Sequence, residues 1–203
     1  MPFLLDAVKQ FRAGPGVDFT AMPRPIDPDD YLLRELDGSG VPVSEIPLDG
    51  TKVDASMSAW APRTLDASRE PLADGFPDLR GVWLVSEGKM SGSVQRIEQA
   101  GNRITITVGG LVHDMFCDGT LENGVDDVAG IGGRHIRVAA EMKNGVHRLR
   151  PFGKPLVMVT RRMSDDRTEM LWRYGPGKNR CVRLTEVPLD HGPTRAAFEA
   201  AQA

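Results

Sequence analysis

From Leu79 onward, the chain reads as a series of short alternating runs separated by turn signals at close spacing. The clearest pair is "RHIRVAAEM" and "GVHRLRP", which flank Asn144-Gly145, the favoured two-residue loop of a β-hairpin. Similar runs are "RGVWLVSE", "GSVQRIEQAG", "NRITITVGG", "LVHDMF", "PLVMVTRRM", "TEMLWRYG" and "NRCVRLTEV". Strands that follow one another so closely pair with their sequence neighbours. The pattern predicts an all-β protein, an up-and-down antiparallel barrel of about eight strands, with a β-sandwich as the alternative.

The first 78 residues differ in texture, because most of the 15 prolines of the chain lie there. One short helix is predicted in "LLDAVKQFRAG" and another in "DPDDYLLREL", where Pro28 follows Asp27 as a helix cap. The apolar residues of this part are not typical of a disordered tail. We therefore expect an irregular, partly helical extension over 1–78 that wraps a barrel domain over 79–187. A tail or short helix is expected over 188–203.

The charge balance and the apolar pattern exclude several classes of protein. With 25 Lys+Arg against 28 Asp+Glu the net charge is −3, which is not the footprint of a nucleic-acid-binding protein. No apolar run approaches the length of a membrane span, and the N-terminal residues do not read as a secretion signal. We expect a cytoplasmic protein with no membrane partner and, with two cysteines, no disulfide framework.

Motifs for metals and cofactors are missing from the sequence. It contains neither Cys-x-x-Cys nor His-Glu-x-x-His, and His113 and Cys117 on one strand would lie about 13 Å apart. "GIGGRH" lacks the lysine of a phosphate loop, and there is no dinucleotide fingerprint and no Gly-x-Ser-x-Gly elbow. No metal and no cofactor are expected, and a hydrolase or a nicotinamide enzyme is disfavoured.

Two of the runs resemble motifs of the calycin superfamily, which includes the lipocalins and the fatty-acid-binding proteins. "GVWLVSE" (81–87) is similar to their Gly-x-Trp first strand, in which the tryptophan plugs the closed end of the barrel. "EMLWRYG" and "NRCVRLTEV" resemble the last two strands of the fatty-acid-binding proteins. The resemblance spans the predicted barrel domain and implies a small hydrophobic ligand held inside it.

The match on the last strand implies a role for Arg183, which corresponds to the carboxylate-binding arginine of that family. Thr185 stands where the family has a tyrosine, which departs from the pattern of a fatty-acid site. Cys181 and Thr185 share a strand face with Arg183, so all three are candidates for the interior. The alternative is an outward Arg183 paired with Glu186, which would contribute little stability.

Further candidates come from residue chemistry. His113 has an ordinary pKa suited to proton transfer near neutral pH, although a structural histidine fits the same pattern. His113 and Asp114 point to opposite faces of a strand and cannot pair directly. His147 and His135 flank the Asn144-Gly145 hairpin and rank behind His113. The candidate catalytic residues are Arg183, His113, Tyr174 and Asp114, and the candidate ligand contacts are Arg183, Thr185, Cys181, Trp172 and His135.

Two functions fit these expectations. The first is a cofactor-independent lyase, isomerase or cyclase that performs acid/base chemistry on a small hydrophobic or aromatic molecule inside the barrel. The second is a non-catalytic intracellular carrier of a hydrophobic metabolite, in which Arg183 anchors a polar end. A haem-binding barrel ranks third. A homodimer is left open by the sequence.

Overall fold

The computed structural model describes residues 28–53, 61–108, 111–127 and 136–185. The helix predicted in "LLDAVKQFRAG", His135 and the C-terminal tail predicted over 188–203 lie outside these residues. The strands are β1 (Thr51–Val53), β2 (Gly81–Gly88), β3 (Val94–Ala100), β4 (Arg103–Val108), β5 (Leu111–Phe116), β6 (Val125–Asp127), β7 (Ile136–Lys143), β8 (Val146–Pro151), β9 (Val159–Met163), β10 (Glu169–Tyr174) and β11 (Gly177–Leu184). Two 3₁₀ turns precede the first long strand, η1 (Pro28–Tyr31) and η2 (Val43–Glu45).

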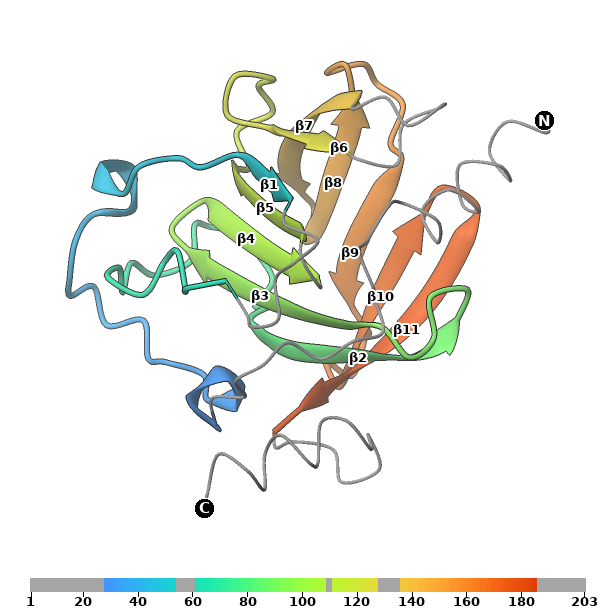
Figure 1. Ribbon diagram of the computed structural model, residues 1–203, viewed down its shortest axis with the longest axis horizontal. Helices are drawn as coiled ribbons and strands as arrows, with labels where there is room; N and C mark the ends of the chain where they lie inside the picture. The colour runs from blue at the N-terminus through green and yellow to red at the C-terminus, as the bar shows by residue number, and fades with distance from the viewer. Residues whose placement is uncertain (1–27, 54–60, 109–110, 128–135, 186–203) are drawn as a thin grey trace.

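All eleven strands belong to one antiparallel sheet in the order β1-β5-β4-β3-β2-β11-β10-β9-β8-β7-β6. The sheet curls until its two edge strands approach each other, as Figure 1 shows. At this seam the Thr51 hydroxyl donates to the Asp126 carbonyl at 2.9 Å and accepts from the Asp126 amide at 2.8 Å. The result is a nearly closed barrel, and its single continuous sheet excludes the sandwich alternative.

The prediction of about eight strands was too low. Both edge strands, β1 and β6, have only three residues, which is too short to show an alternating pattern in sequence. Strand β1 also lies within the predicted N-terminal extension, where it pairs with β5 from Thr51 opposite His113 to Val53 opposite Leu111. The predicted hairpin at Asn144-Gly145 is confirmed between β7 and β8, with φ angles of 52° and 70° at its two turn residues.

The helix predicted in "DPDDYLLREL" is wrong beyond its first turn. Only η1 forms, and the chain then continues without helix along the barrel. The Asp30 carboxylate accepts a hydrogen bond from Arg96 of β3 at 3.0 Å, and Tyr31 is buried while Leu32 is exposed. Contacts with the barrel wall therefore override the local helix propensity of this segment.

Strand alternation divides the barrel wall into an inner and an outer face. The inner face carries the main apolar core, including Trp83, Ile97, Ile106 and Met170. A register shift between Arg180 and Cys181 lets β11 continue against β2 with Cys181 opposite Val85. Beyond that bulge, Arg183 lies opposite Trp83 on the same inner face.

The inner face ends at Trp83, which is completely buried. Its indole nitrogen donates to the Leu79 carbonyl at 2.8 Å. The Arg183 guanidinium covers the ring, with its carbon 4.7 Å from the ring centroid, and donates to the Asp78 carbonyl at 3.2 Å. Trp83 and Arg183 therefore pack against each other near the start of β2.

Two segments, residues 29–50 and 61–80, lie against the outer face of β3, β4 and β5, and we call them the strap. Figure 1 shows the first as the blue and cyan chain beside these strands. Under the strap, Arg103 and Asp114 form a fully buried ion pair with contacts of 2.6 and 2.8 Å. The same guanidinium donates to the carbonyls of Ile46 and Pro47, so the pair fastens the strap to the wall.

Candidate functional site

A row of inner-face side chains crosses five neighbouring strands. Met142 of β7 lies opposite His147 of β8, and His147 lies opposite Arg161 of β9. Arg161 in turn lies opposite Trp172 of β10, and Trp172 lies opposite Asn179 of β11. Four of these five side chains are polar or carry a polar nitrogen, although the surrounding inner face is apolar. The row is therefore the most polar part of the barrel interior that the structure describes.

Arg161 holds its place through contacts on both sides. Its guanidinium carbon lies 5.2 Å from the Trp172 ring centroid, and its Nε donates to the Gln95 side-chain oxygen at 3.4 Å. The Gln95 amide lies 3.9 Å from the Cys181 sulfur. Burial raises the pKa of the Cys181 thiol to about 12, and the charge of Arg161 only partly offsets this effect. Cys181 is therefore a neutral packing thiol at neutral pH.

His113 of β5 faces the same space as the row. Burial, together with the positive charge of Arg161, lowers the pKa of both His113 and His147 to about 3. His147 is in addition affected by His113. His147 and Arg161 are cross-strand neighbours, and His113 also affects the pKa of His147, so we group the three side chains. Both histidines are neutral at neutral pH, whereas Arg161 is charged.

We call His113, His147, Arg161, Trp172 and Gln95 the interior cluster. Within the described residues, both ring nitrogens of His147, Nε2 of His113 and the indole nitrogen of Trp172 are buried without a hydrogen-bond partner. A buried polar atom left in this state costs about 1–3 kcal/mol. Folded proteins keep few such atoms, and each one needs an explanation. Four such atoms in one cluster make this part of the barrel interior a candidate site.

Partly accessible side chains border the cluster. Met142, which is the direct neighbour of His147, faces inward and keeps part of its surface accessible. His113 is also only half-buried although it lies in the middle of its strand. Tyr174 is half-buried too and meets Trp172 edge to face at 6.5 Å. These three half-buried side chains lie beside the fully buried atoms of the cluster.

The structure brings four of the predicted site residues to the interior. His113 and Trp172 belong to the cluster, Cys181 touches Gln95, and Tyr174 packs beside Trp172. Arg183 also lies on the inner face, but there it contacts Trp83 and Asp78 and not the interior cluster. Burial lowers the pKa of Arg183, an effect that the nearby Asp78 opposes.

The other predicted site residues lie elsewhere. Asp114 is on the outer face, where it accepts hydrogen bonds from Arg103, Thr105 and the Asp49 amide under the strap. Thr185 is exposed just beyond the end of β11. His135 lies outside the described residues. Asp114 is thus occupied by the strap and is not brought to the interior cluster.

Sequence reasoning did not single out Arg161 or Gln95, and it ranked His147 behind His113. The sequence position of Arg161 could have indicated an inward side chain. Val159, Arg161 and Met163 stand at alternate positions, so they share one face of the strand. The adjacent Arg162 faces outward. The signal for His147 was its alternation with Leu149 in β8.

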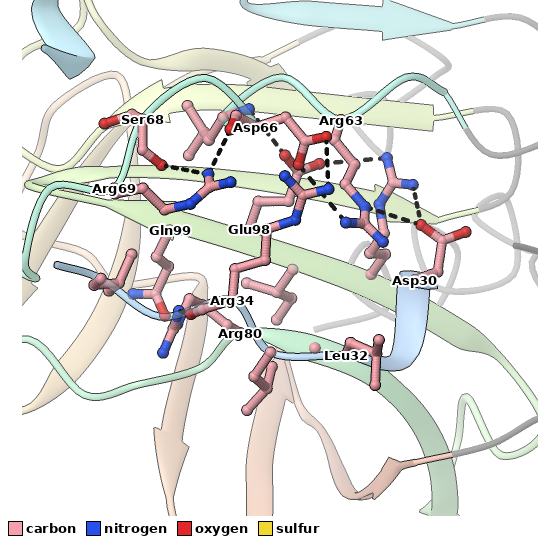
Figure 2. A pocket seen from close by; sticks show the side chains of 16 residues that line it. Asp30, Leu32, Arg34, Arg63, Asp66, Ser68, Arg69, Arg80, Glu98 and Gln99 are labelled. Atoms are coloured by element: carbon pink, nitrogen blue, oxygen red, sulfur yellow. Dashed lines mark hydrogen bonds and ion pairs between the residues drawn. The ribbon is translucent and has the colours of Figure 1, made fainter. Parts of the chain in front are cut away.

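A second polar place lies between the strap and β3, and Figure 2 shows charged side chains from both converging there. Arg96 and Arg63 meet the Asp30 carboxylate at 3.0 and 3.2 Å, and Arg34 meets Asp66 at 3.2 Å. Burial raises the pKa of Glu98, which lies in the same group. The cavity beside these residues has about 60 Å³, which is room for a few water molecules only. This cluster fastens the strap.

A groove of about 470 Å³ also lies over β9, β10 and β11, lined by outward side chains that include Arg162, Arg173 and Lys178. Its Arg180 is paired with Glu169 at 2.5 Å and with Glu87 at 3.8 Å. Exposed charges such as these are hydrated and need no ligand. The buried nitrogens of the interior cluster are shielded from bulk water, so the barrel interior is the stronger candidate site.

Comparison with known proteins gives no assignment, since no family model, no curated protein and no solved structure matches the chain. Among the described residues, no group of three or more His, Cys, Asp or Glu side chains is arranged to hold a metal ion. In the same part of the chain, no helix is long and apolar enough to cross a membrane. The functional argument therefore rests on the interior cluster.

Proposed function

We propose that the protein binds a small, mainly apolar organic molecule inside its barrel, with a polar end of that molecule against the interior cluster. The observation that carries this proposal is the set of buried nitrogens without partners on His113, His147 and Trp172. Binding sites for small molecules are mostly apolar with a few convergent polar groups, which is the composition of this inner face.

The proposal includes a calycin-like barrel. Support comes from the Gly81-x-Trp83 motif, from the burial of Trp83 at a barrel end and from the cover that Arg183 provides. Eleven strands instead of about eight depart from the expected form. Under this proposal Arg183 belongs to the closed end, and Arg161 takes the position of the interior cation.

The proposal is tested with N-phenyl-1-naphthylamine, a neutral aromatic probe whose fluorescence rises in apolar surroundings. The wild-type protein is expected to bind it at a single site. Met142→Trp puts a large ring beside His147 and should weaken binding at least about tenfold, because the site would be filled. Arg162→Trp adds the same ring to the outer face and serves as the matched control. Equal binding by both variants, or no binding by wild type, would remove the proposal.

A second candidate function is a cofactor-independent lyase or isomerase that uses the same site. The observation in its favour is a pair of neutral imidazoles close to each other, since one can accept a proton while the other donates one. The test is proton exchange at carbon in D₂O, followed by NMR over a panel of small cyclic ketones. Exchange that depends on His113 and His147 supports catalysis, whereas its absence leaves binding alone.

A further inference from the structure

The charges and hydrogen-bond donors of the interior cluster indicate which kind of ligand it would bind. This inference rests on the proposed function above. Arg161 is buried on the inner face between its cross-strand neighbours His147 and Trp172. The nitrogens of Trp172 and Arg161 are hydrogen-bond donors only, and each neutral imidazole has one donor. The cluster is therefore richer in donors than in acceptors.

We propose that the interior cluster binds an anionic oxygen group of its ligand, and that the histidine pair takes up a proton as this group binds. The anion lies against Arg161 and the Trp172 indole N–H, within reach of the unpartnered nitrogens of His147 and His113. A donor-rich site that holds a buried cation fits a carboxylate, a sulfonate or a phenolate better than a neutral apolar end.

Proton uptake is expected because a bound anion would offset the two effects that keep His113 and His147 unprotonated in the free protein. Burial and the positive charge of Arg161 both disfavour an imidazolium at His113 or His147. An anion in contact with the pair compensates for both effects, because it supplies a negative charge and accepts hydrogen bonds from the imidazolium. The proton is shared by a coupled pair, so it belongs to the pair and to neither residue alone.

The surrounding elements supply few other titratable groups. Among the described residues that face the pair, β9 contributes Arg161, β10 contributes Tyr174 and β11 contributes Cys181. Besides Arg161, the neighbours directly opposite the histidines are Met142, Ile106 and Thr51, none of which titrates. The histidine pair is thus the group in this surrounding whose ordinary pKa lies near neutrality.

The experiment compares two probes that share one aromatic skeleton, 8-anilinonaphthalene-1-sulfonate and its neutral analogue N-phenyl-1-naphthylamine. The sulfonate stays ionised at all pH values used, so any pH dependence belongs to the protein. For wild type, affinity for the sulfonate should fall from about pH 6 to about pH 8 by at least about fivefold, while affinity for the neutral probe stays flat. Calorimetry in two buffers with different ionisation enthalpies should show proton uptake with the sulfonate only.

Three variants test which side chains cause the preference for the sulfonate and its pH dependence. Arg161→Met should weaken sulfonate binding at least about tenfold and change neutral-probe binding by less than about threefold. His113→Gln combined with His147→Gln cannot take up the proton, so its sulfonate affinity should not change with pH. Arg162→Met removes the adjacent arginine on the outer face and should bind both probes like wild type, which excludes surface binding of the sulfonate.

The outcomes separate this inference from the proposed function. Binding of the neutral probe with equal or weaker binding of the sulfonate would overturn the anion assignment and leave the proposed function standing. A pH-independent sulfonate affinity in wild type would overturn proton uptake. Absence of binding for both probes would overturn the proposed function itself. Circular dichroism melts of each variant verify that a loss of binding is not a loss of fold.

Discussion

The guanidinium of Arg161 lies over the Trp172 ring inside the barrel, with its carbon 5.2 Å from the ring centroid, and the two residues are direct cross-strand neighbours. Contact with an aromatic face lets a cation be buried at lower cost than contact with aliphatic side chains. The same contact fixes the plane of the guanidinium beside His147. The fold thus places a charged group on the inner face of the barrel, where burial is costly unless the charge is paired and hydrogen-bonded.

Trp83 on the inner face of the barrel gives the first prediction. Trp83→Ala should lower the free energy of unfolding by about 3–5 kcal/mol, because it removes a completely buried indole and its hydrogen bond to Leu79. Denaturant melts measure the change. A loss below about 1 kcal/mol would contradict the role of Trp83 as the plug of the barrel.

Arg183 gives a prediction that separates the barrel end from the binding site. Arg183→Met keeps the aliphatic stem and loses the stacking on Trp83 and the hydrogen bond to Asp78. Unfolding free energy should fall by about 0.5–2 kcal/mol, while affinity for N-phenyl-1-naphthylamine should stay within about twofold of wild type. A stable variant with strongly weakened binding would instead agree with the sequence-based expectation that Arg183 contacts the ligand.

The buried pair of Arg103 and Asp114 gives a third prediction. Arg103→Met leaves the Asp114 carboxylate buried without its cation and frees the strap carbonyls, so unfolding free energy should fall by about 3–5 kcal/mol. The double variant with Asp114→Leu removes the uncompensated charge and should recover part of that loss. Double-variant stability equal to the sum of the two single losses would argue against a coupled pair.

The two buried histidines predict how stability depends on pH. Their pKa values of about 3 in the folded protein lie below the ordinary value near 6.5, so the unfolded chain binds more protons between these values. Stability should therefore fall as pH falls through this window. At about pH 5, each histidine should cost about 2 kcal/mol relative to about pH 8. The variant with both His113→Gln and His147→Gln should be flatter over this range, and an unchanged slope would contradict burial of neutral imidazoles.

Much of the fold was predictable from sequence, because each long strand alternates and each hairpin carries its own turn residues. The Asn144-Gly145 turn requires positive φ at both residues, which few other dipeptides tolerate. The edge strands were not predictable, since three residues such as Thr51–Val53 form a strand only when β5 offers them a partner. The helix predicted in "DPDDYLLREL" does not continue past η1, because contacts with the barrel wall, such as the hydrogen bond from Arg96 to Asp30, are also invisible in the local sequence.

The candidate site was predictable only in part. Trp172 and His113 were named as candidates from sequence, since aromatic and titratable residues stand out in a strand, and both lie in the interior cluster. Arg161 and His147 become site candidates only through the strand register, which places them opposite each other on β8 and β9. Register between strands depends on the closure of the whole barrel, and a single sequence does not display it.

The most direct test of the interior site is NMR of the imidazole nitrogens with and without N-phenyl-1-naphthylamine. The signals of His113 and His147 are assigned by comparison with His113→Gln and His147→Gln. In the free protein both rings should be neutral near pH 6, and the probe should shift the nitrogen resonances of both. Binding of the probe with both imidazoles unchanged would contradict the assignment of the ligand site to the barrel interior.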